Sequence, residues 1–393
     1  MPPVNRIAEF APEMTAWRRH LHAHPELGLD CHETAAFVAA RLREFGVDEV
    51  HEGIARTGVV AIIEGQGPGP VTGLRADMDA LPMTEETGAE HASTVPGKMH
   101  ACGHDGHTAM LLGAARYLAE TRNFSGRVVL LFQPAEETIG GARIMVEEGV
   151  MDRFGIEEVY ALHNSPALPE GAFATRPGPI MAAVDDFTIT LRGKGGHAAR
   201  PHTCIDPIPA AMGLGLAMQT IASRKTDPMA QIVVSITQIH AGSAMNVIPE
   251  TAMIAGTVRT FDAGVRDMAE ARIRALAEAH AAGAELGVEI DYDRSYPATV
   301  NHAEQTAFAA DIAREISGGD AVDADAPPVM GAEDFSYMLE ARPGAYLKLG
   351  QGLGPGVHHP KFDFNDEVAP LGASFFVKVI ERRHALSQVA AAE

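Results

Sequence analysis

Residues 127–137, RVVLLFQPAEE, contain the segment that decides the fold of this chain. The first seven residues form a nearly continuous apolar run, which predicts a β-strand buried on both faces of a sheet. Two adjacent acids, Glu136 and Glu137, follow that strand. A strand buried in this way is typical of an α/β fold, in which helices cover the sheet.

Polar residues also follow two other predicted strands. Acids follow the strand predicted at residues 71–75, and a histidine follows the strand predicted at residues 158–162. In an open α/β sheet the functional edge lies at the carboxyl ends of the strands. We therefore expect five side chains to gather at this edge: Asp77, Asp79, Glu136, Glu137 and His163.

A second motif, MHACGHDGHTA at residues 99–109, carries potential metal ligands. The apolar residues that follow have helical spacing, so the motif lies on a loop that opens a helix. Cys102 and His104 are close enough in sequence to bind one ion, and transition metals favour thiolate and imidazole ligands. The alternative is a loop of solvated histidines.

The chain as a whole offers enough ligands for a hydrolytic metal site. Such a site needs fixed ligands, an open coordination position and a base for water. Five ligands of mixed charge exceed the needs of one tetrahedral structural zinc and fit one or two catalytic ions. The candidates are Cys102, His104, Glu137, His163 and one of His358 or His359.

The pair Glu136–Glu137 permits a division of labour, in which one carboxylate binds metal and its neighbour accepts a proton. The alternative is that both acids merely stabilise the N-terminus of a helix through its dipole. Their position after a buried strand, among other ligands, favours the chemical role.

Composition excludes some functions. The formal net charge of −21 argues against a nucleic-acid partner, because phosphate binding needs a basic surface. No run of 18 apolar residues predicts a membrane span, and the first residues lack a signal-peptide pattern. Three widely spaced cysteines indicate a reducing compartment, so we expect a cytoplasmic protein.

The length of 393 residues favours two domains. The strand and helix patterns between residues 183 and 295 follow the order β-α-β-β-α-β, which is the ferredoxin-like unit. We therefore expect residues 1–182 and 296–393 to form a metal-binding α/β domain, with residues 183–295 inserted as a second domain.

The chain resembles the two-domain metal-dependent amidohydrolases and peptidases of the aminoacylase, hippurate hydrolase and carboxypeptidase type. The likeness covers nearly the whole length and is greatest to the hippurate hydrolase and auxin-conjugate hydrolase branch. The motifs that carry it are LRADMDALPM (74–83), MHACGHDGH (99–107), FQPAEE (132–137), HN (163–164), GKGGHAARPH (193–202), NVIP (246–249), GAEDF (331–335) and HHPKFDFND (358–366).

The resemblance implies roles for the candidate residues. Asp79 takes the position of an acid that orients a metal-binding group, and Glu136 is the implied general base. Asp77 stands where the wider family has a histidine ligand, for which Cys102 compensates in this branch. The spacing to Pro360 selects His358 over His359, so the implied ligands are Cys102, His104, Glu137, His163 and His358.

The inserted domain resembles the lid of this family, which in many relatives also carries the dimer contact. The resemblance implies that His197 hydrogen-bonds the scissile carbonyl oxygen as negative charge develops. It also implies that Asn246 and Arg259 hold a substrate carboxylate, for which the planar fork of arginine is suited. Without the resemblance, His197 is simply a loop residue, and the less favoured alternative for Arg259 is a surface ion pair.

We therefore expect an amidohydrolase that uses Zn, Mn, Co or Ni to cleave the amide bond of a small-molecule N-acyl amino acid. It should form a homodimer or a homo-oligomer built from dimers. A dipeptidase or carboxypeptidase on the same scaffold is one alternative. A metal-binding protein that has lost turnover is another, although retention of Glu136 and Glu137 argues against it. A hydrolase that uses the Cys102 thiol as nucleophile is the third.

Overall fold

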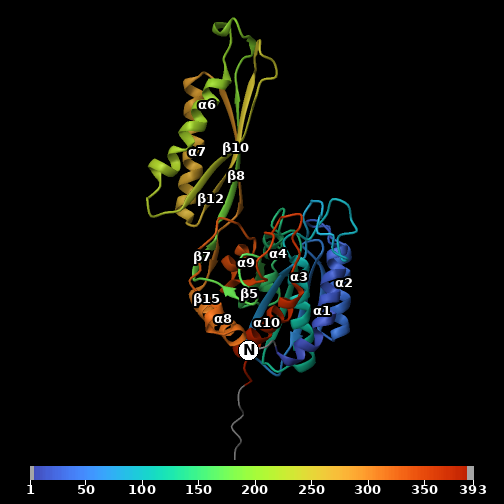
Figure 1. Cartoon of the computed structure of the whole chain (residues 1–393). Helices are drawn as coiled ribbons and strands as arrows, with labels where there is room; N and C mark the ends of the chain where they lie inside the picture. Colours follow the sequence, from blue (N-terminus) through green and yellow to red (C-terminus); the bar gives the residue numbers. More distant parts are fainter. Residues whose placement is uncertain (1–3, 387–393) are drawn as a thin grey trace, which may run out of the picture. The chain divides into compact units, whose positions relative to one another are not determined.

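The computed structural model describes residues 4–386, which form two compact units (Figure 1). Unit 1 contains residues 4–180, 300–327 and 334–386. Unit 2 contains Met181–Thr299 and Pro328–Glu333. The sequence patterns did not predict that residues 328–333 belong with unit 2.

Unit 1 is built from two groups of elements. Its helices are α1 (Asn5–Ala23), α2 (His32–Phe45), α3 (His104–Thr121), α4 (Gly141–Glu147), α5 (Val150–Arg153), α8 (Ala303–Ser317), α9 (Phe335–Ala341) and α10 (Ala369–Arg383). Its strands are β1 (Glu49–Ile54), β2 (Gly58–Glu64), β3 (Val71–Asp77), β4 (Arg127–Gln133), β5 (Glu158–Ser165), β6 (Phe173–Ala174), β15 (Val322–Asp323) and β16 (Gly344–Gly350).

The sheet of unit 1 is mixed, in the order β1-β2-β4-β3-β5-β16-β6-β15. Its centre is parallel, because β3 pairs in parallel with both β4 and β5, and β5 with β16. On one side β2 runs antiparallel to β4, and on the other β6 runs antiparallel to β16. The predicted α/β class is confirmed, and the parallel centre directs several strand ends to one edge.

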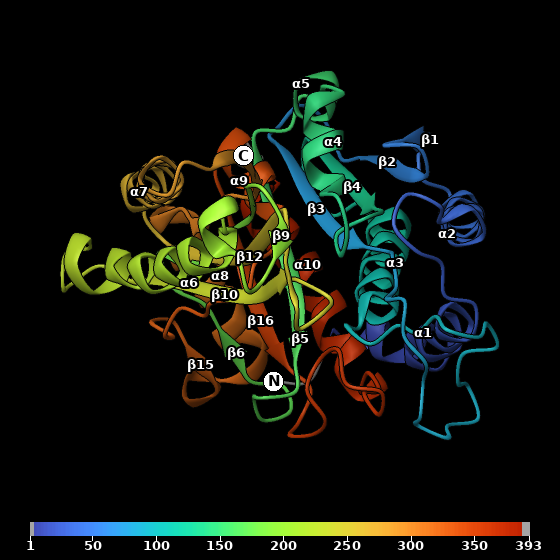
Figure 2. The ribbon, with the colours of Figure 1, turned by 90° about the horizontal axis from the view of Figure 1, so that it is seen from above.

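Helices cover both faces of this sheet. Apolar residues of α1, α3 and α10 pack with the sheet into one large core. Figure 2 shows α3 and α10 on one face and α4 and α9 on the other. The strand β4 lies between these layers, which is why its residues from Val128 to Gln133 are all buried. None of the helices in the described part of the chain is long and apolar enough to cross a bilayer.

Unit 2 contains the sheet β10-β12-β8-β13 and the helices α6 and α7. The bounds are β8 (Ala183–Arg192), α6 (Pro207–Met218), β10 (Ile232–Ala241), β12 (Thr251–Thr260), α7 (Ala263–Gly283) and β13 (Gly287–Tyr296). This chain order and sheet order are those of the ferredoxin-like unit. Both helices contribute buried residues to one core with the sheet, so the strands alternate between buried and more exposed residues.

Candidate metal centre

The site in unit 1 lies at the carboxyl ends of its parallel strands, as the sequence predicted. Asp77 is the last residue of β3, and Glu136 and Glu137 lie in the turn that follows β4. His163 lies near the end of β5. The two glutamates therefore do not begin a helix, because α4 starts only at Gly141.

All five predicted ligands contribute to overlapping groups whose donor atoms lie within 4.8 Å of one another. Cys102 Sγ is 3.4 Å from His163 Nε2. His358 Nε2 is 3.1 Å from Glu137 Oε1, and His104 Nε2 is 3.9 Å from the same oxygen. The groups that contain one or more of these ligands are Cys102–His104–His163, Asp77–His104–His107, Cys102–Glu137–His358 and His104–Glu136–Glu137.

Local backbone geometry holds several of these residues in place. Gly103, between Cys102 and His104, has a φ of +94°, and an added Cβ would lie 2.3 Å from Asn164 Oδ1. Only glycine therefore fits this step of the loop. Ala135 and His358 adopt left-handed backbone angles, with φ of 60° and 65°. Such strain in residues with a side chain is concentrated at functional sites.

Two of the candidate histidines are held through Nδ1, which leaves Nε2 directed to the site. His104 Nδ1 donates a hydrogen bond to the backbone oxygen of Asp79 at 2.8 Å, and His163 Nδ1 donates to that of Asn164 at 2.7 Å. Because a carbonyl only accepts, the lone pair of each ring lies on Nε2. Metal-binding histidines are typically oriented by this kind of bond.

The buried His104 Nε2 makes no hydrogen bond within residues 4–386. Its nearest acidic oxygens, on Asp77 and Glu137, are 3.7 and 3.9 Å away. An isolated buried nitrogen of this kind is costly without a partner, and a cation would supply one. Together with the thiol and the carboxylates, the donor set fits one or two divalent cations.

The electrostatics of the site also favour a cation. Burial raises the pKa of the Cys102 thiol well above its usual value, and Glu137 and Glu136 raise it further. Burial lowers the pKa of His104, but Asp77, Asp79 and Glu137 outweigh that effect and raise it to about 10. The shift of His104, and the smaller part of the shift of Cys102, reflect nearby negative charge, which a bound cation would offset.

Asp79 holds the two glutamates by their backbones. Its Oδ1 accepts a hydrogen bond from the Glu136 N–H at 2.9 Å, and its Oδ2 accepts one from the Glu137 N–H at 3.1 Å. Its own backbone oxygen orients His104. The aspartate thus connects a candidate base to two candidate ligands.

Asp77 and His107 bind each other and lie close to the candidate ligand His104, whose Nε2 is 3.7 Å from Asp77 Oδ2. His107 Nδ1 is 2.6 Å from Asp77 Oδ1, and its Nε2 is 2.7 Å from Asn164 Oδ1. Asp77 also pairs with Arg75 Nη1 at 2.7 Å, which holds the pKa of the buried carboxyl low despite its desolvation. Both residues therefore stabilise the structure around the predicted ligands.

A second network, which sequence reasoning missed, connects α1 to the start of α3. His22 Nδ1 donates to Asp105 Oδ2 at 2.7 Å, and Arg18 bonds Asp366 at 2.6 Å and Asp363 at 2.9 Å. Burial lowers the pKa of His22, but Asp105 and other acids raise it to about 10. These partners lie far apart in the sequence, and no pattern in the sequence connects them.

Sequence reasoning also missed a fully buried triad behind the glutamates. Arg75 Nη2 lies 2.9 Å from Asp334 Oδ1, and Arg75 Nε lies 2.8 Å from Gln133 Oε1. Gln133 Nε2 donates to the same aspartate at 2.7 Å. The motif GAEDF contains Asp334, so a signal existed, but nothing in the sequence identified its partners.

The remaining predicted residues belong to unit 2. His197 lies on the short strand β9 (Gly196–His197), which pairs with β11 (Val247–Ile248). The backbone oxygen of Asn246 accepts a hydrogen bond from the Ala198 N–H at 3.0 Å, so the predicted histidine and asparagine are neighbours. Arg259 lies on β12 and is half-buried, with its Nε 3.3 Å from Thr257 Oγ1.

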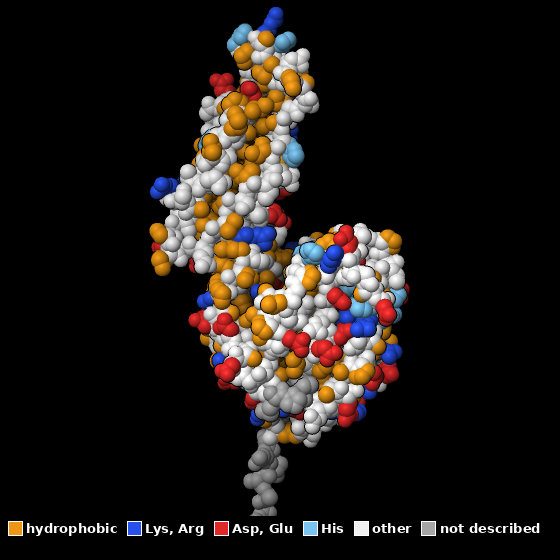
Figure 3. All heavy atoms as spheres, in the orientation of Figure 1, with side chains coloured by type: hydrophobic (Ala, Val, Ile, Leu, Met, Phe, Trp, Pro, Cys, Tyr) orange, Lys and Arg blue, Asp and Glu red, His pale blue; other side chains and the backbone are white. Residues whose placement is uncertain are grey.

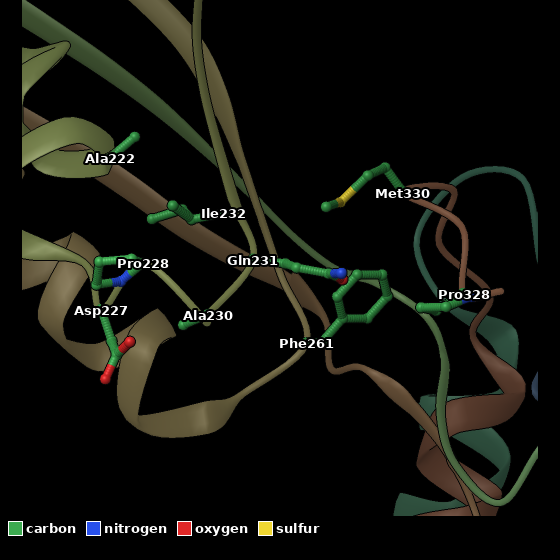
Figure 4. A pocket seen from close by; sticks show the side chains of 9 residues that line it. All are labelled: Ala222, Asp227, Pro228, Ala230, Gln231, Ile232, Phe261, Pro328 and Met330. Carbon is green, nitrogen blue, oxygen red and sulfur yellow. The ribbon is translucent and has the colours of Figure 1, made fainter.

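A cavity of about 440 Å³ in unit 2 lies apart from these residues (Figure 4). Figure 4 shows that Asp227, its one charged lining residue, points away from Phe261 and Met330. Such a lining offers no cation for a substrate carboxylate. The other lining residues are Ala222, Pro228, Ala230, Gln231, Ile232 and Pro328.

Of the two adjacent histidines, His358 contacts the site. Its ring reaches Glu137, whereas His359 Nδ1 accepts a hydrogen bond from the Lys361 N–H at 3.0 Å. The assignment of His358 as the ligand remains a prediction, which its contact with Glu137 supports.

Known proteins resemble this chain throughout its length. N-acetyl-L-cysteine deacetylase of Bacillus subtilis is 42% identical over 95% of this chain and 88% of its own, and hippurate hydrolase of Campylobacter jejuni is 39% identical over 96% and 98%. The crystal structure of the Bacillus subtilis YXEP protein, described as a dinuclear metal binding peptidase, has a TM-score of 0.83 and 36% identity over 95% and 99%. The model of peptidase family M20/M25/M40 matches residues 73–382, and the chain belongs to this family.

Proposed function

We propose that this protein is a metal-dependent amidohydrolase that cleaves the amide bond of N-acyl amino acids to a carboxylic acid and a free amino acid. The observation that carries the proposal is the convergence of Cys102, His104, Glu137, His163 and His358 beside Glu136. The relatives named as a deacetylase and a hippurate hydrolase support the reaction class. The expected cations are Zn, Mn, Co or Ni, because the ligands combine sulfur, nitrogen and oxygen.

The cation, Glu136 and Asp79 have different roles in the proposed reaction. A cation held by Cys102, His104, Glu137, His163 and His358 would supply Lewis acidity, which would polarise the amide carbonyl and lower the pKa of water. Glu136 removes a proton from the attacking water and later delivers it to the leaving amine. Asp79 keeps Glu136 in position through the backbone hydrogen bond described above.

On unit 2, we propose that Asn246 and Arg259 bind the α-carboxylate and that His197 donates a hydrogen bond to the developing oxyanion. The exposure of His197 and its proximity to Asn246 are consistent with substrate contact. His197→Ala should lower kcat about 10²–10³-fold, the range for loss of one oxyanion donor. KM should change less, because the oxygen becomes negative only during the reaction. Steady-state kinetics that match the unaltered protein would remove His197 from the mechanism.

A substrate panel tests the proposed reaction. Protein reconstituted with each metal is assayed on N-acetyl, N-benzoyl and indoleacetyl amino acids and on dipeptides of the same amino acids. We expect the N-acyl compounds to be cleaved with the higher kcat/KM. Preference for dipeptides would instead favour a dipeptidase or carboxypeptidase. A relative named thermostable carboxypeptidase 1, which is 42% identical to this chain, supports that alternative. Glu136→Gln, purified in parallel, controls for contaminating hydrolases.

We also propose that the protein is a cytoplasmic homodimer that associates through unit 2. The helix α6 is apolar on its outer side, where Met212 is 58% and Leu216 75% exposed. Ile239, on the edge strand β10, is 56% exposed. Figure 3 shows hydrophobic side chains gathered along unit 2, and a large exposed apolar area is typical of an interface. A molecular mass of one chain by sedimentation equilibrium would contradict this association.

A further inference from the structure

One charged residue of unit 1, Lys348, lies in the interior of the sheet and is not used by the proposed mechanism. It belongs to β16, between β5 and β6 in the sheet. The other residues of this strand, GAYLKLG, are all buried, and Lys348 is only partly exposed. A lysine here is unusual, because interior strands of such sheets are normally apolar.

The register of the sheet places Lys348 beside the candidate metal centre. Lys348 is the in-register partner of His163 on the neighbouring parallel strand β5. Residues opposite each other in neighbouring strands project from the same face. Tyr346, two residues earlier on β16, also lies on this face, with its ring centroid 6.3 Å from that of His163. The stem of Lys348 therefore starts next to a predicted ligand.

The ammonium of Lys348 makes no hydrogen bond or ion pair with any residue in the range 4–386. Burial lowers the pKa of Lys348, and no neighbouring charge contributes to that shift. By contrast, Lys378 on α10 lies 3.5 Å from Glu381. In a chain with 52 acidic and 31 basic residues, a partly buried lysine without an acid is a notable exception.

A cation that has lost part of its hydration and has no protein partner is unfavourable unless a ligand supplies the counter-charge. The site next to it is expected to bind an anionic substrate. The α-carboxylate of that substrate is already assigned to Asn246 and Arg259. Lys348 is therefore available for a further anion, and a carboxylate is the anion that N-acyl amino acids most directly offer.

We propose that Lys348 binds a second carboxylate of the substrate, so that the preferred substrates are N-acyl amino acids with two carboxylates. This inference rests on the proposed amidohydrolase function. The second carboxylate has two possible sources with the same chemistry, namely a dicarboxylic acyl group or an acidic amino-acid side chain.

Two matched pairs of compounds distinguish these sources. N-succinyl-L-alanine is compared with N-butyryl-L-alanine, and N-acetyl-L-aspartate with N-acetyl-L-asparagine. We expect the unaltered protein to prefer the charged member of one pair. Lys348→Met should raise KM for that compound about 10–100-fold, the range for loss of a hydrogen bond to a charged group. Its effect on the neutral member should be much smaller, and Lys348→Arg should restore part of the preference.

Lys378→Met serves as the matched control, because that lysine lies on α10 and pairs with Glu381. It should leave the ratio of the two KM values unchanged. Equal effects of Lys348→Met on both members of each pair, or none on either, would overturn the proposal. A large KM increase for N-acetyl-L-alanine would also overturn it, because Lys348 would then bind the α-carboxylate.

Calorimetry separates this inference from the proposed function. The same four compounds are titrated into metal-loaded Glu136→Gln, with and without Lys348→Met. One outcome is that binding shows a charge preference that depends on Lys348, while the unaltered protein hydrolyses none of the compounds. This outcome would refute the proposed function and support the anion site. Hydrolysis without any dependence on Lys348 in either measurement would refute the anion site and support the proposed function.

Discussion

Glu136→Gln should reduce kcat about 10²–10⁴-fold, the usual contribution of a general base, while the protein keeps its metal. Glutamine has nearly the same shape as glutamate but cannot accept the proton from water. The Glu136 backbone would still donate to Asp79, so the turn should keep its structure. Steady-state kinetics and elemental analysis of the same preparation measure both effects.

Glu137→Gln is the matched control for this experiment, because it makes the same chemical change one residue later. The side chain of Glu137 contacts His358 and faces His104, and those bases keep the pKa of its carboxyl low despite burial. Loss of its charge should therefore weaken metal binding as well as turnover. Equal loss of metal from both variants would contradict the proposed division between base and ligand.

Removal of metal should abolish hydrolysis altogether, and Zn, Mn, Co or Ni should restore it. The reason is that a cation held by these carboxylates, imidazoles and thiol would polarise the amide carbonyl and lower the pKa of water, and no other group of the proposed mechanism does so. The measurement is activity after dialysis against a chelator, with metal content determined for each sample. A chelator saturated with calcium controls for effects other than metal removal. Full activity in protein shown to be free of metal would refute the mechanism and favour the Cys102 thiol alternative.

A single substitution should also remove metal from the site. His358→Ala should lower metal content, whereas His359→Ala should not, because only the first ring contacts Glu137. The reverse order would transfer the ligand role to His359.

The parallel core and its functional edge could be predicted because they depend on local patterns. The strand β4 has the predicted bounds, Arg127–Gln133, since its uninterrupted apolar run ends just before a proline. The helix α2 likewise ends at a local signal, because Phe45 is followed by Gly46, which has a φ of 76°. Polar residues that directly follow such strands necessarily meet at one edge.

The supporting contacts could not be predicted because their partners are far apart in sequence. Arg75 and Asp334 are separated by 259 residues, and Arg18 and Asp366 by 348. No periodicity identifies which buried charge will pair with which. The isolation of Lys348 is equally invisible in sequence, because only the three-dimensional structure shows that no acid within residues 4–386 pairs with it.

The position of β16 has a consequence for synthesis of the chain. The strand β5 needs β16 as its neighbour, but β16 begins roughly 180 residues after β5 ends, with the whole of the ferredoxin-like segment between them. At about 5–20 residues per second, a ribosome takes on the order of 10–40 seconds to produce that stretch. During this interval an apolar strand edge of the nascent chain has no partner, which is the condition that favours aggregation or binding by chaperones.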